Sequence, residues 1–275
     1  MIFKLIWIFD AVFTALCLAL IPGASVWSAL LYAVLGFLLG NLLFALTFTV
    51  NGLLLPVLAP GEPIRKQRRL SRWICANVGE WLCGYSLVRV EVVGREKLPK
   101  TPFLFVSNHR SAFDPLSVIS ALREYNISFI TKPSNLKVRI VDSTTRHAGY
   151  LAIDRENNRE ALKTILTAAD YLKRGLCSIG IYPEGTRSRS GELLPFHAGS
   201  FKIAQKAGVP VAIVCTSGAA TLKKRRFPGV RTLRLEVLEV LEAERVCAMS
   251  TAELAEEARS KIAARLEELK KEGQA

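Results

Sequence analysis

The feature that most constrains this chain is a long run of residues without a charge. No Asp, Glu, Lys or Arg occurs between Ala11 and Gly61, and two apolar stretches, residues 5–21 and 26–58, are separated only by the short sequence PGAS. A helix needs about 20 residues to cross the ~30 Å hydrocarbon core of a bilayer. The sequence therefore predicts an N-terminal hydrophobic helical membrane segment over residues 1–60, arranged as two spans or as a hairpin that enters one leaflet.

A cleaved signal peptide is the alternative for this segment. Lys4 precedes an apolar run, and small residues follow it, as in a secretory signal. Asp10 interrupts the run, however, and a longer apolar stretch follows at once, which favours a retained membrane segment. Asn41 and Asn51 lie in the second stretch and are expected at a helix–helix contact or in the headgroup region, because their amides need hydrogen-bond partners.

Positive charge is concentrated after the hydrophobic segment. The chain has 275 residues and a formal net charge of +13, and 36 of its 37 Lys and Arg follow Gly61. This sign favours anionic partners such as nucleic acid, anionic lipid or phosphorylated small molecules. The hydrophobic segment favours membrane lipids and argues against nucleic acid. Five basic residues between Arg65 and Arg72 would keep the region that follows on the cytoplasmic side under the positive-inside rule.

Residues 61–85 read as a basic amphipathic helix at the membrane surface. Apolar side chains recur at helical spacing at Ile74, Val78, Trp81, Leu82 and Tyr85. A helix that packs on a protein core has the same spacing and stays an alternative. Lys and Arg beside anionic headgroups each contribute about 1 kcal/mol, so the adjacent basic block favours the membrane.

From residue 86 to 275 the patterns predict an α/β domain with a mixed β-sheet flanked by helices. Runs rich in β-branched residues alternate with helical patterns, which is typical of this class. The final helix opens at Ser250 with the capping-box sequence STAE. The predicted strands are 87–93, 103–107, 127–131, 177–182, 211–216 and 232–240, and the other predicted helices are 115–124, 156–174 and 198–207.

The six cysteines are scattered, without a C-x-x-C pair and without histidine at metal-ligand spacing. Several lie in apolar runs, where cysteine behaves as a small hydrophobe. We expect reduced cysteines and neither zinc nor another metal site.

The sequence NHRSAFD, residues 108–114, places an imidazole five residues before a carboxylate. Asp114 followed by Pro115 fits a helix N-cap with proline at the first helical position. The same carboxylate could orient His109 as a general base, and the local sequence leaves both interpretations open. His147 and His197 have no carboxylate placed in this way, and we expect them at the surface or in loops.

The sequence YPEGTRSRSGEL, residues 182–193, follows directly on a predicted strand. Arg187 and Arg189 offer planar forks that suit bidentate phosphate contacts, and Gly185 lets backbone N–H groups approach an anion. A solvated turn with a Glu–Arg pair is the alternative, because runs of charge usually mark exposed turns.

Four blocks occur in order along the chain: His109 with Asp114, GYLAIDR at 149–155, YPEGTRSR at 182–189 and VPVAIV at 209–214. This series resembles the glycerolipid acyltransferases, the family that contains 1-acylglycerol-3-phosphate acyltransferase, over about residues 85–220. The resemblance implies that His109 is a base aligned by Asp114 and that VPVAIV belongs to the sheet behind the site. It also implies a binding site for the acceptor's phosphate, lined by Arg155, Glu184, Gly185, Thr186 and Arg187. In that site the two arginines would hold the phosphate, and Glu184 would orient an arginine or the acceptor's hydroxyl.

The implied reaction is transfer of a fatty acyl chain from acyl-CoA or acyl carrier protein to lysophosphatidic acid, giving phosphatidic acid. A glycerol hydroxyl is a poor nucleophile, so a neutral imidazole would take its proton as the oxygen attacks the thioester. Asp114 would hold the imidazole tautomer and stabilise the imidazolium. No acyl-enzyme is required, so Ser111 need not be a nucleophile, and no cofactor or metal is expected.

Between Ile130 and Gly149 the sequence departs from the family, because only Lys132, Leu136 and Lys137 match the expected lysine-rich amphipathic stretch. The departure affects how this region meets the membrane and which headgroup it accepts. Two alternatives therefore stay open: acylation of another lysolipid or an amino-acid-containing lipid, and a non-catalytic anionic-lipid-binding membrane protein. The expected location is the cell inner membrane, with the acyltransferase domain on its cytoplasmic face.

Overall fold

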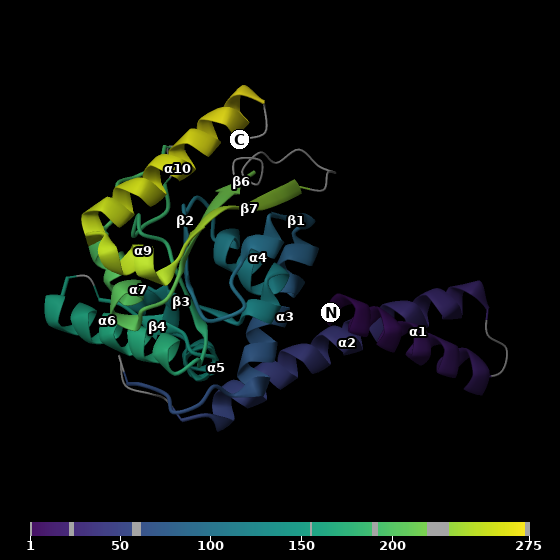
Figure 1. Cartoon of the computed structure of the whole chain (residues 1–275). Coiled ribbons are helices and arrows are strands. Elements are labelled where there is room, and N and C mark those ends of the chain that lie inside the picture. Colours follow the sequence, from purple (N-terminus) through teal and green to yellow (C-terminus); the bar gives the residue numbers. More distant parts are fainter. Residues whose placement is uncertain are drawn as a thin grey trace.

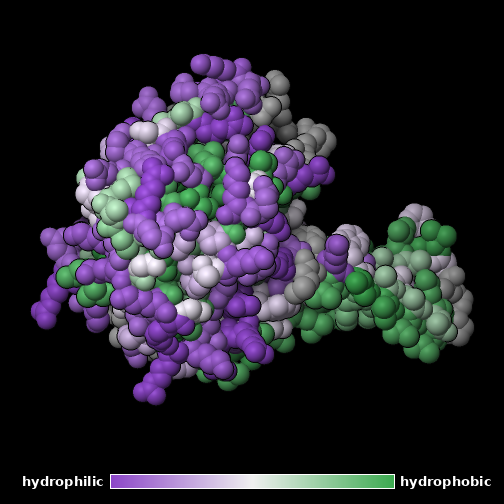
Figure 2. Space-filling model, viewed as in Figure 1, coloured by the Kyte–Doolittle hydropathy of each residue, from purple (hydrophilic) through white to green (hydrophobic). Residues whose placement is uncertain are grey.

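A helical hairpin projects from an α/β body in the computed structural model (Figure 1). The structure describes residues 2–21, 25–56, 62–154, 156–188, 192–218 and 231–272. The hairpin consists of α1 (Ile2–Leu20) and α2 (Val26–Leu54), and its apolar surface contrasts with the polar body (Figure 2). Among the residues described, one helix, α2, is long and apolar enough to cross a membrane.

Two glycines let α1 approach α2 closely. A Cβ atom at Gly36 would lie 2.6 Å from Asp10 Oδ1, and one at Gly40 would lie 3.3 Å from Ile6 Cγ2. Glycines four residues apart are the usual means by which apolar helices pack at short range. The two helices therefore pack along one another as one unit.

Helix α3 (Arg69–Tyr85) lies between the hairpin and the body (Figure 1). Trp81 Nε1 and Tyr85 Oη donate to Asn41 Oδ1 over 2.8 and 2.7 Å. Asn51 Nδ2 donates to the hydroxyls of Ser71 on α3 and of Thr144 on α5 (Arg139–His147).

Both asparagines of α2 are therefore at helix–helix contacts, one of the two environments expected from the sequence. Leu82 and Val78 of α3 are half-buried and Ile74 is fully buried, because α3 packs on α4 (Phe113–Ala121) as well as on the hairpin.

The body contains a seven-stranded mixed sheet in the order β1-β7-β6-β2-β5-β3-β4, in which only the β6–β7 pair is antiparallel among the described strands. The strands are β1 (Val88–Val93), β2 (Leu104–Ser107), β3 (Ile127–Thr131), β4 (Leu151–Ala152), β5 (Ser178–Ile181), β6 (Val211–Ser217) and β7 (Arg231–Leu241). The predicted α/β class and mixed sheet are confirmed.

Helices cover both faces of this sheet, because alternate residues of a strand point to opposite faces. In β2, Leu104 and Val106 belong to a core shared with α6, α7, α9 and α10, whereas Phe105 faces α4. The helices of the body are α4 (Phe113–Ala121), α5 (Arg139–His147), α6 (Asn158–Lys173), α7 (Lys202–Ala207), α9 (Ala243–Ala248) and α10 (Thr251–Lys271). Short 3-10 turns lie at Arg95–Lys97, Arg123–Tyr125, Pro133–Leu136 and Ala198–Phe201.

Helix α5 is the main element that the sequence did not predict. It lies within the segment that departs from the family pattern and packs against α2 and α3. His147, expected at the surface or in a loop, is instead buried in its last turn, with Nδ1 2.7 Å from Ser143 O. That prediction is wrong because the neighbouring helices cover α5. His197 is exposed, as expected.

Candidate active site

The NHRSAFD and YPEGTRSR segments meet at one edge of the sheet because β2 and β5 are neighbouring parallel strands. Carboxyl ends of parallel strands lie at the same edge, so the segments that follow Ser107 and Ile181 are brought side by side. Ser188 N donates to His109 O over 2.9 Å and joins them directly.

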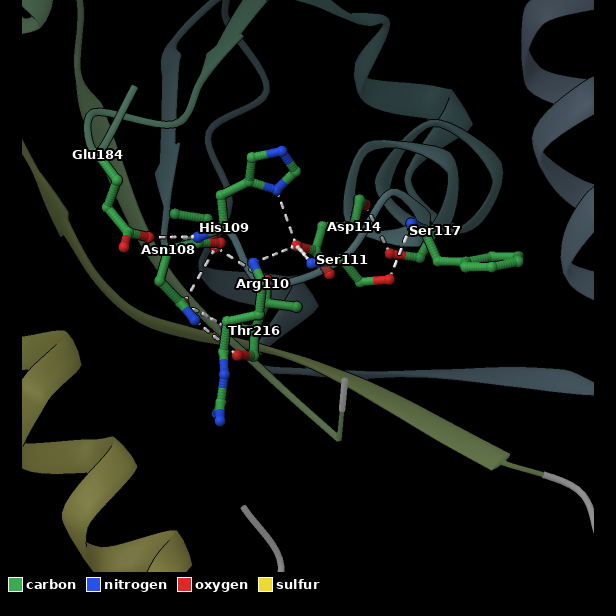
Figure 3. A network of polar contacts seen from close by, with 10 residues as sticks. Asn108, His109, Arg110, Ser111, Asp114, Ser117, Glu184 and Thr216 are labelled. Carbon is green, nitrogen blue, oxygen red and sulfur yellow. Dashed lines mark hydrogen bonds and ion pairs between the residues drawn. The ribbon is translucent and has the colours of Figure 1, made fainter. Parts of the chain in front are cut away.

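Asn108 anchors the first segment to the strand on the other side of β2. Its Nδ2 donates to Thr216 O and its Oδ1 accepts from Thr216 N, both over 2.8 Å (Figure 3). The Ser107 and Thr216 hydroxyls are also 2.8 Å apart. This buried network ties the end of β2 to the end of β6 and so holds the backbone of His109 in place.

His109 and Asp114 form a hydrogen-bonded pair, with Nδ1 2.9 Å from Oδ2 (Figure 3). The Asp114 carboxylate is fully buried, and Oδ2 also accepts from the backbone N–H groups of Arg110 and Ser111, each over 2.7 Å. Because an ionised carboxylate can only accept, it selects the imidazole tautomer that carries hydrogen on Nδ1. The other nitrogen, Nε2, is left with a lone pair that can accept a proton.

The N-cap interpretation of Asp114 is wrong. Helix α4 begins at Phe113, so Asp114 lies within its first turn, and its carboxylate bonds to residues that precede the helix. The loop folds back over the side chain and brings the N–H groups of Arg110 and Ser111 closer than those of the helix. The interpretation of Asp114 as the group that orients His109 fits the observed geometry.

Tyr182 is a site residue that the sequence reasoning missed. Its ring stacks on the His109 ring, with centroids 4.3 Å apart and an interplanar angle of 17°, and its other face stacks on Phe129 at 5.2 Å. The hydroxyl is buried without a hydrogen-bond partner among the described residues, and burial raises the pKa of Tyr182 well above its ordinary value. The position at the end of a strand, directly before Pro183, was the available signal.

Glu184 clamps the two segments together through backbone groups. Its Oε1 accepts from His109 N over 2.5 Å and its Oε2 accepts from Leu194 N over 3.0 Å. Burial raises the pKa of this carboxyl group above its ordinary value. The expected contact with an arginine is not formed within the described part of the chain, where the two oxygens accept from backbone N–H groups instead.

Gly185, Thr186 and Arg187 form the turn that follows. Gly185 has φ +75°, a left-handed conformation that favours glycine, and its N–H donates to Tyr182 O over 3.0 Å. That N–H therefore closes the turn rather than facing an anion. Thr186 and Arg187 are exposed, and Arg187 has no carboxylate partner among the described residues. Arg155, predicted to bind phosphate, lies outside the described residues.

A cavity of about 620 Å³ extends from His109 towards the hairpin. One end is polar, with His109, Thr186, Arg187 and also Lys132, which was not among the predicted site residues. The remaining wall is mainly apolar and is contributed by α2, α3, α4, α5, β3 and the 3-10 turn at Pro133–Leu136. Its apolar residues include Phe48, Ile74, Val78, Leu116, Ile119, Phe129, Ile130 and Leu136.

Comparison with known proteins assigns the family. The profile of the Acyltransferase family matches residues 89–217, which include the His109–Asp114 pair and Glu184–Arg187. The 1-acyl-sn-glycerol-3-phosphate acyltransferase of Escherichia coli strain K12 is 30% identical over 169 residues, covering 62% of this chain and 69% of that protein. The chain belongs to the acyltransferase family.

Two further relatives are also named 1-acyl-sn-glycerol-3-phosphate acyltransferases. The protein from Saccharomyces cerevisiae is 27% identical over 214 residues, covering 74% of this chain and 68% of the yeast protein. The relative from Chlamydomonas reinhardtii is 33% identical over 161 residues, and the match spans 57% of this chain and only 47% of the algal protein.

The fold of the acyltransferase matches a crystal structure, that of the 1-acyl-sn-glycerophosphate acyltransferase PlsC from Thermotoga maritima. The TM-score is 0.60 at 23% identity, and the match covers 84% of this chain and 97% of that chain. The structural match covers more of this chain than the family profile, which matches residues 89–217. The likeness in fold therefore extends beyond the segment that carries the motifs.

Proposed function

We propose that this acyltransferase moves a fatty acyl chain from a thioester donor to the free hydroxyl of lysophosphatidic acid, giving phosphatidic acid. The observation that carries the proposal is that one cavity contains a base, an arginine without a carboxylate partner among the described residues, and an apolar wall. His109 and Arg187 line its polar end, and apolar side chains of α2, α3, α4 and β3 are among those that line the rest. These three features suit a reacting hydroxyl, a phosphate and an acyl chain, respectively.

His109 acts as the general base. Its Nε2 takes the proton of the acceptor's hydroxyl as the oxygen attacks the thioester carbonyl. Asp114 holds the tautomer and stabilises the imidazolium that forms. The tetrahedral intermediate then collapses, the C–S bond breaks, and the leaving sulfur takes the proton from the imidazolium. The products are an ester and a free thiol, and no acyl-enzyme is formed.

The donor is acyl-CoA or acyl carrier protein, and its acyl chain lies along the apolar wall. Arg187 binds the acceptor's phosphate, and Arg155 is the second arginine for it. Thr186 precedes Arg187 in the turn. Holding the phosphate orients the hydroxyl towards Nε2, which converts binding energy into alignment.

A transfer assay with the purified full chain tests this proposal. Lysophosphatidic acid, lysophosphatidylcholine, lysophosphatidylglycerol and a lysolipid with an amino-acid headgroup are offered with each of the two donors. We expect kcat/KM to be highest for lysophosphatidic acid. A preference for an acceptor without a terminal phosphate would instead support one of the alternative acceptors, and no transfer to any acceptor would support a lipid-binding role alone.

Replacing Arg187 with alanine is expected to lower kcat/KM for lysophosphatidic acid by about 10- to 150-fold, since a charge-assisted contact contributes about 1.5–3 kcal/mol. The KM for the thioester donor should change little. Arg159→Ala, which removes an exposed arginine on α6, is the matched control. Arg155→Ala is expected to act in the same direction. Parental acceptor kinetics in both site variants would show that the phosphate binds elsewhere.

We further propose that the hairpin anchors the enzyme in the cell inner membrane with the body on the cytoplasmic face. Residues 26–40 of α2 precede the contact of Asn41 with α3. At 1.5 Å per residue they extend about 22 Å, which is less than the ~30 Å hydrocarbon core. A hairpin of this length enters the bilayer without crossing it.

Cysteine labelling distinguishes entry from crossing. Trp27, at the start of α2, is strongly exposed, so Trp27→Cys in a Cys17→Ala background reports the position of the hairpin tip. We expect no reaction with a membrane-impermeant maleimide added from the periplasmic side. Native Cys247, exposed on α9, should react only from the cytoplasmic side and serves as the control. Periplasmic labelling of Cys at position 27 would show that the hairpin spans the membrane.

A further inference from the structure

A second cavity, of about 850 Å³, lies between α3 and the segment that connects α4 to β3. His109, Asp114 and the Glu184–Arg187 turn do not line it, so it is distinct from the active-site cavity. Its floor is apolar and includes Leu70, Trp73 and Ala76 of α3 together with Ile127 at the start of β3.

Three arginines lie around this apolar floor: Arg69, Arg72 and Arg123. Arg123 forms an ion pair with Glu80. Arg69 and Arg72 have no carboxylate partner among the described residues, and the one carboxylate that lines the cavity, Glu124, is paired with Arg95 over 2.9 Å. The cavity therefore combines an apolar floor with two arginines that have no carboxylate partner among the described residues. An anionic amphiphile can place its apolar part on such a floor and its charged group on such arginines.

The cavity adjoins the base of the membrane hairpin. Trp73, in its floor, packs edge to face on Phe44 of α2, with ring centroids 6.0 Å apart. Asn77, in its wall, accepts a hydrogen bond from Ile2 N at the start of α1 over 3.1 Å. An amphiphile in the bilayer beside the hairpin can thus reach this cavity without passing through the active site.

We propose that this cavity binds an anionic phospholipid of the surrounding bilayer. The headgroup phosphate contacts Arg69 and Arg72, and part of one acyl chain lies along the floor beside Trp73 and Ala76. Cys75, Ile119 and Tyr150 line both this cavity and the active-site cavity. A bound lipid therefore supports, from behind, the wall against which the donor's acyl chain lies.

Native mass spectrometry of the full chain in mild detergent tests this site with phosphatidylglycerol and, separately, phosphatidylcholine. We expect the parent to retain one phosphatidylglycerol and no phosphatidylcholine. The Arg69→Ala/Arg72→Ala double variant should retain about tenfold less phosphatidylglycerol than the parent, since two charge-assisted contacts are removed. The control is Arg159→Ala/Lys163→Ala, which removes two exposed cations from α6 and should retain lipid like the parent.

A second variant separates a filled cavity from general surface charge. Ala76→Phe places a ring on the floor without changing any charge, so it should lose the retained phosphatidylglycerol yet float with phosphatidylglycerol vesicles as the parent does. If Ala76→Phe retained phosphatidylglycerol at the parental level, the lipid would be held by the arginines at the surface and not inside the cavity. This result would overturn the proposal. Equal retention of phosphatidylcholine, or displacement of the lipid by coenzyme A at micromolar concentration, would also overturn it.

Discussion

His109→Ala is expected to lower the rate of acyl transfer by about 10²–10⁴-fold, the usual contribution of a general base. The loss should appear in kcat with either donor, because the alanine variant retains the cavity, Arg187 and the apolar wall. Folding and membrane attachment should be unchanged, since the partly exposed imidazole contacts Asp114 and stacks on Tyr182 but does not belong to either core cluster around the sheet.

Initial rates, a thermal melt and membrane fractionation of the same preparation measure these three properties. His197→Ala is the matched control, because His197 is exposed and lies outside the cavity. A His109→Ala enzyme that turned over at the parental rate would exclude His109 as the base, whatever its geometry.

Asp114→Asn is expected to lower kcat by about 10²–10⁴-fold with little change in KM for either substrate, because the amide removes the charge that stabilises the imidazolium. A helix cap alone would predict almost no loss of any kind, since Asn caps helices about as well as Asp. The structure predicts a modest loss of stability as well. The amide oxygen can still accept from Arg110 and Ser111, but the amide nitrogen then occupies the position of Oδ1, which is buried and has no partner among the described residues. An unsatisfied buried donor costs about 1–3 kcal/mol.

The control for this stability loss is Ser117→Ala. The Ser117 hydroxyl donates to Asp114 O over 2.7 Å, so its removal loosens the same turn without touching the imidazole. If Asp114 acts on the base, Ser117→Ala should lower the melting temperature with little effect on kcat, whereas Asp114→Asn lowers both. Parallel losses of stability and kcat in the two variants would assign Asp114 a structural role only.

Properties that depend on local periodicity were predictable from the sequence. The uncharged run from Ala11 to Gly61 requires an apolar environment in any arrangement, and the alternation of strand and helix patterns after residue 86 specifies an α/β domain. The resemblance carried by the two motif segments was enough to name His109, Asp114 and Arg187, and a parallel sheet explains why two such segments, each at the end of a strand, lie together.

The tertiary structure decided which groups contact one another, because periodicity reports that a side chain is buried but not what lies against it. His109 N and Glu184 are 75 residues apart and meet only because β2 and β5 are neighbours in the sheet. The stacking of Tyr182 on His109 follows from the same neighbour relation. The helical conformation of residues 139–147 depends on packing against α2 and α3, which a polar sequence does not reveal. The donors nearest to Asp114 could not be predicted either, because they depend on the path of the five-residue loop 108–112 between β2 and α4. That path is selected by the buried carboxylate and its neighbours rather than by local propensity.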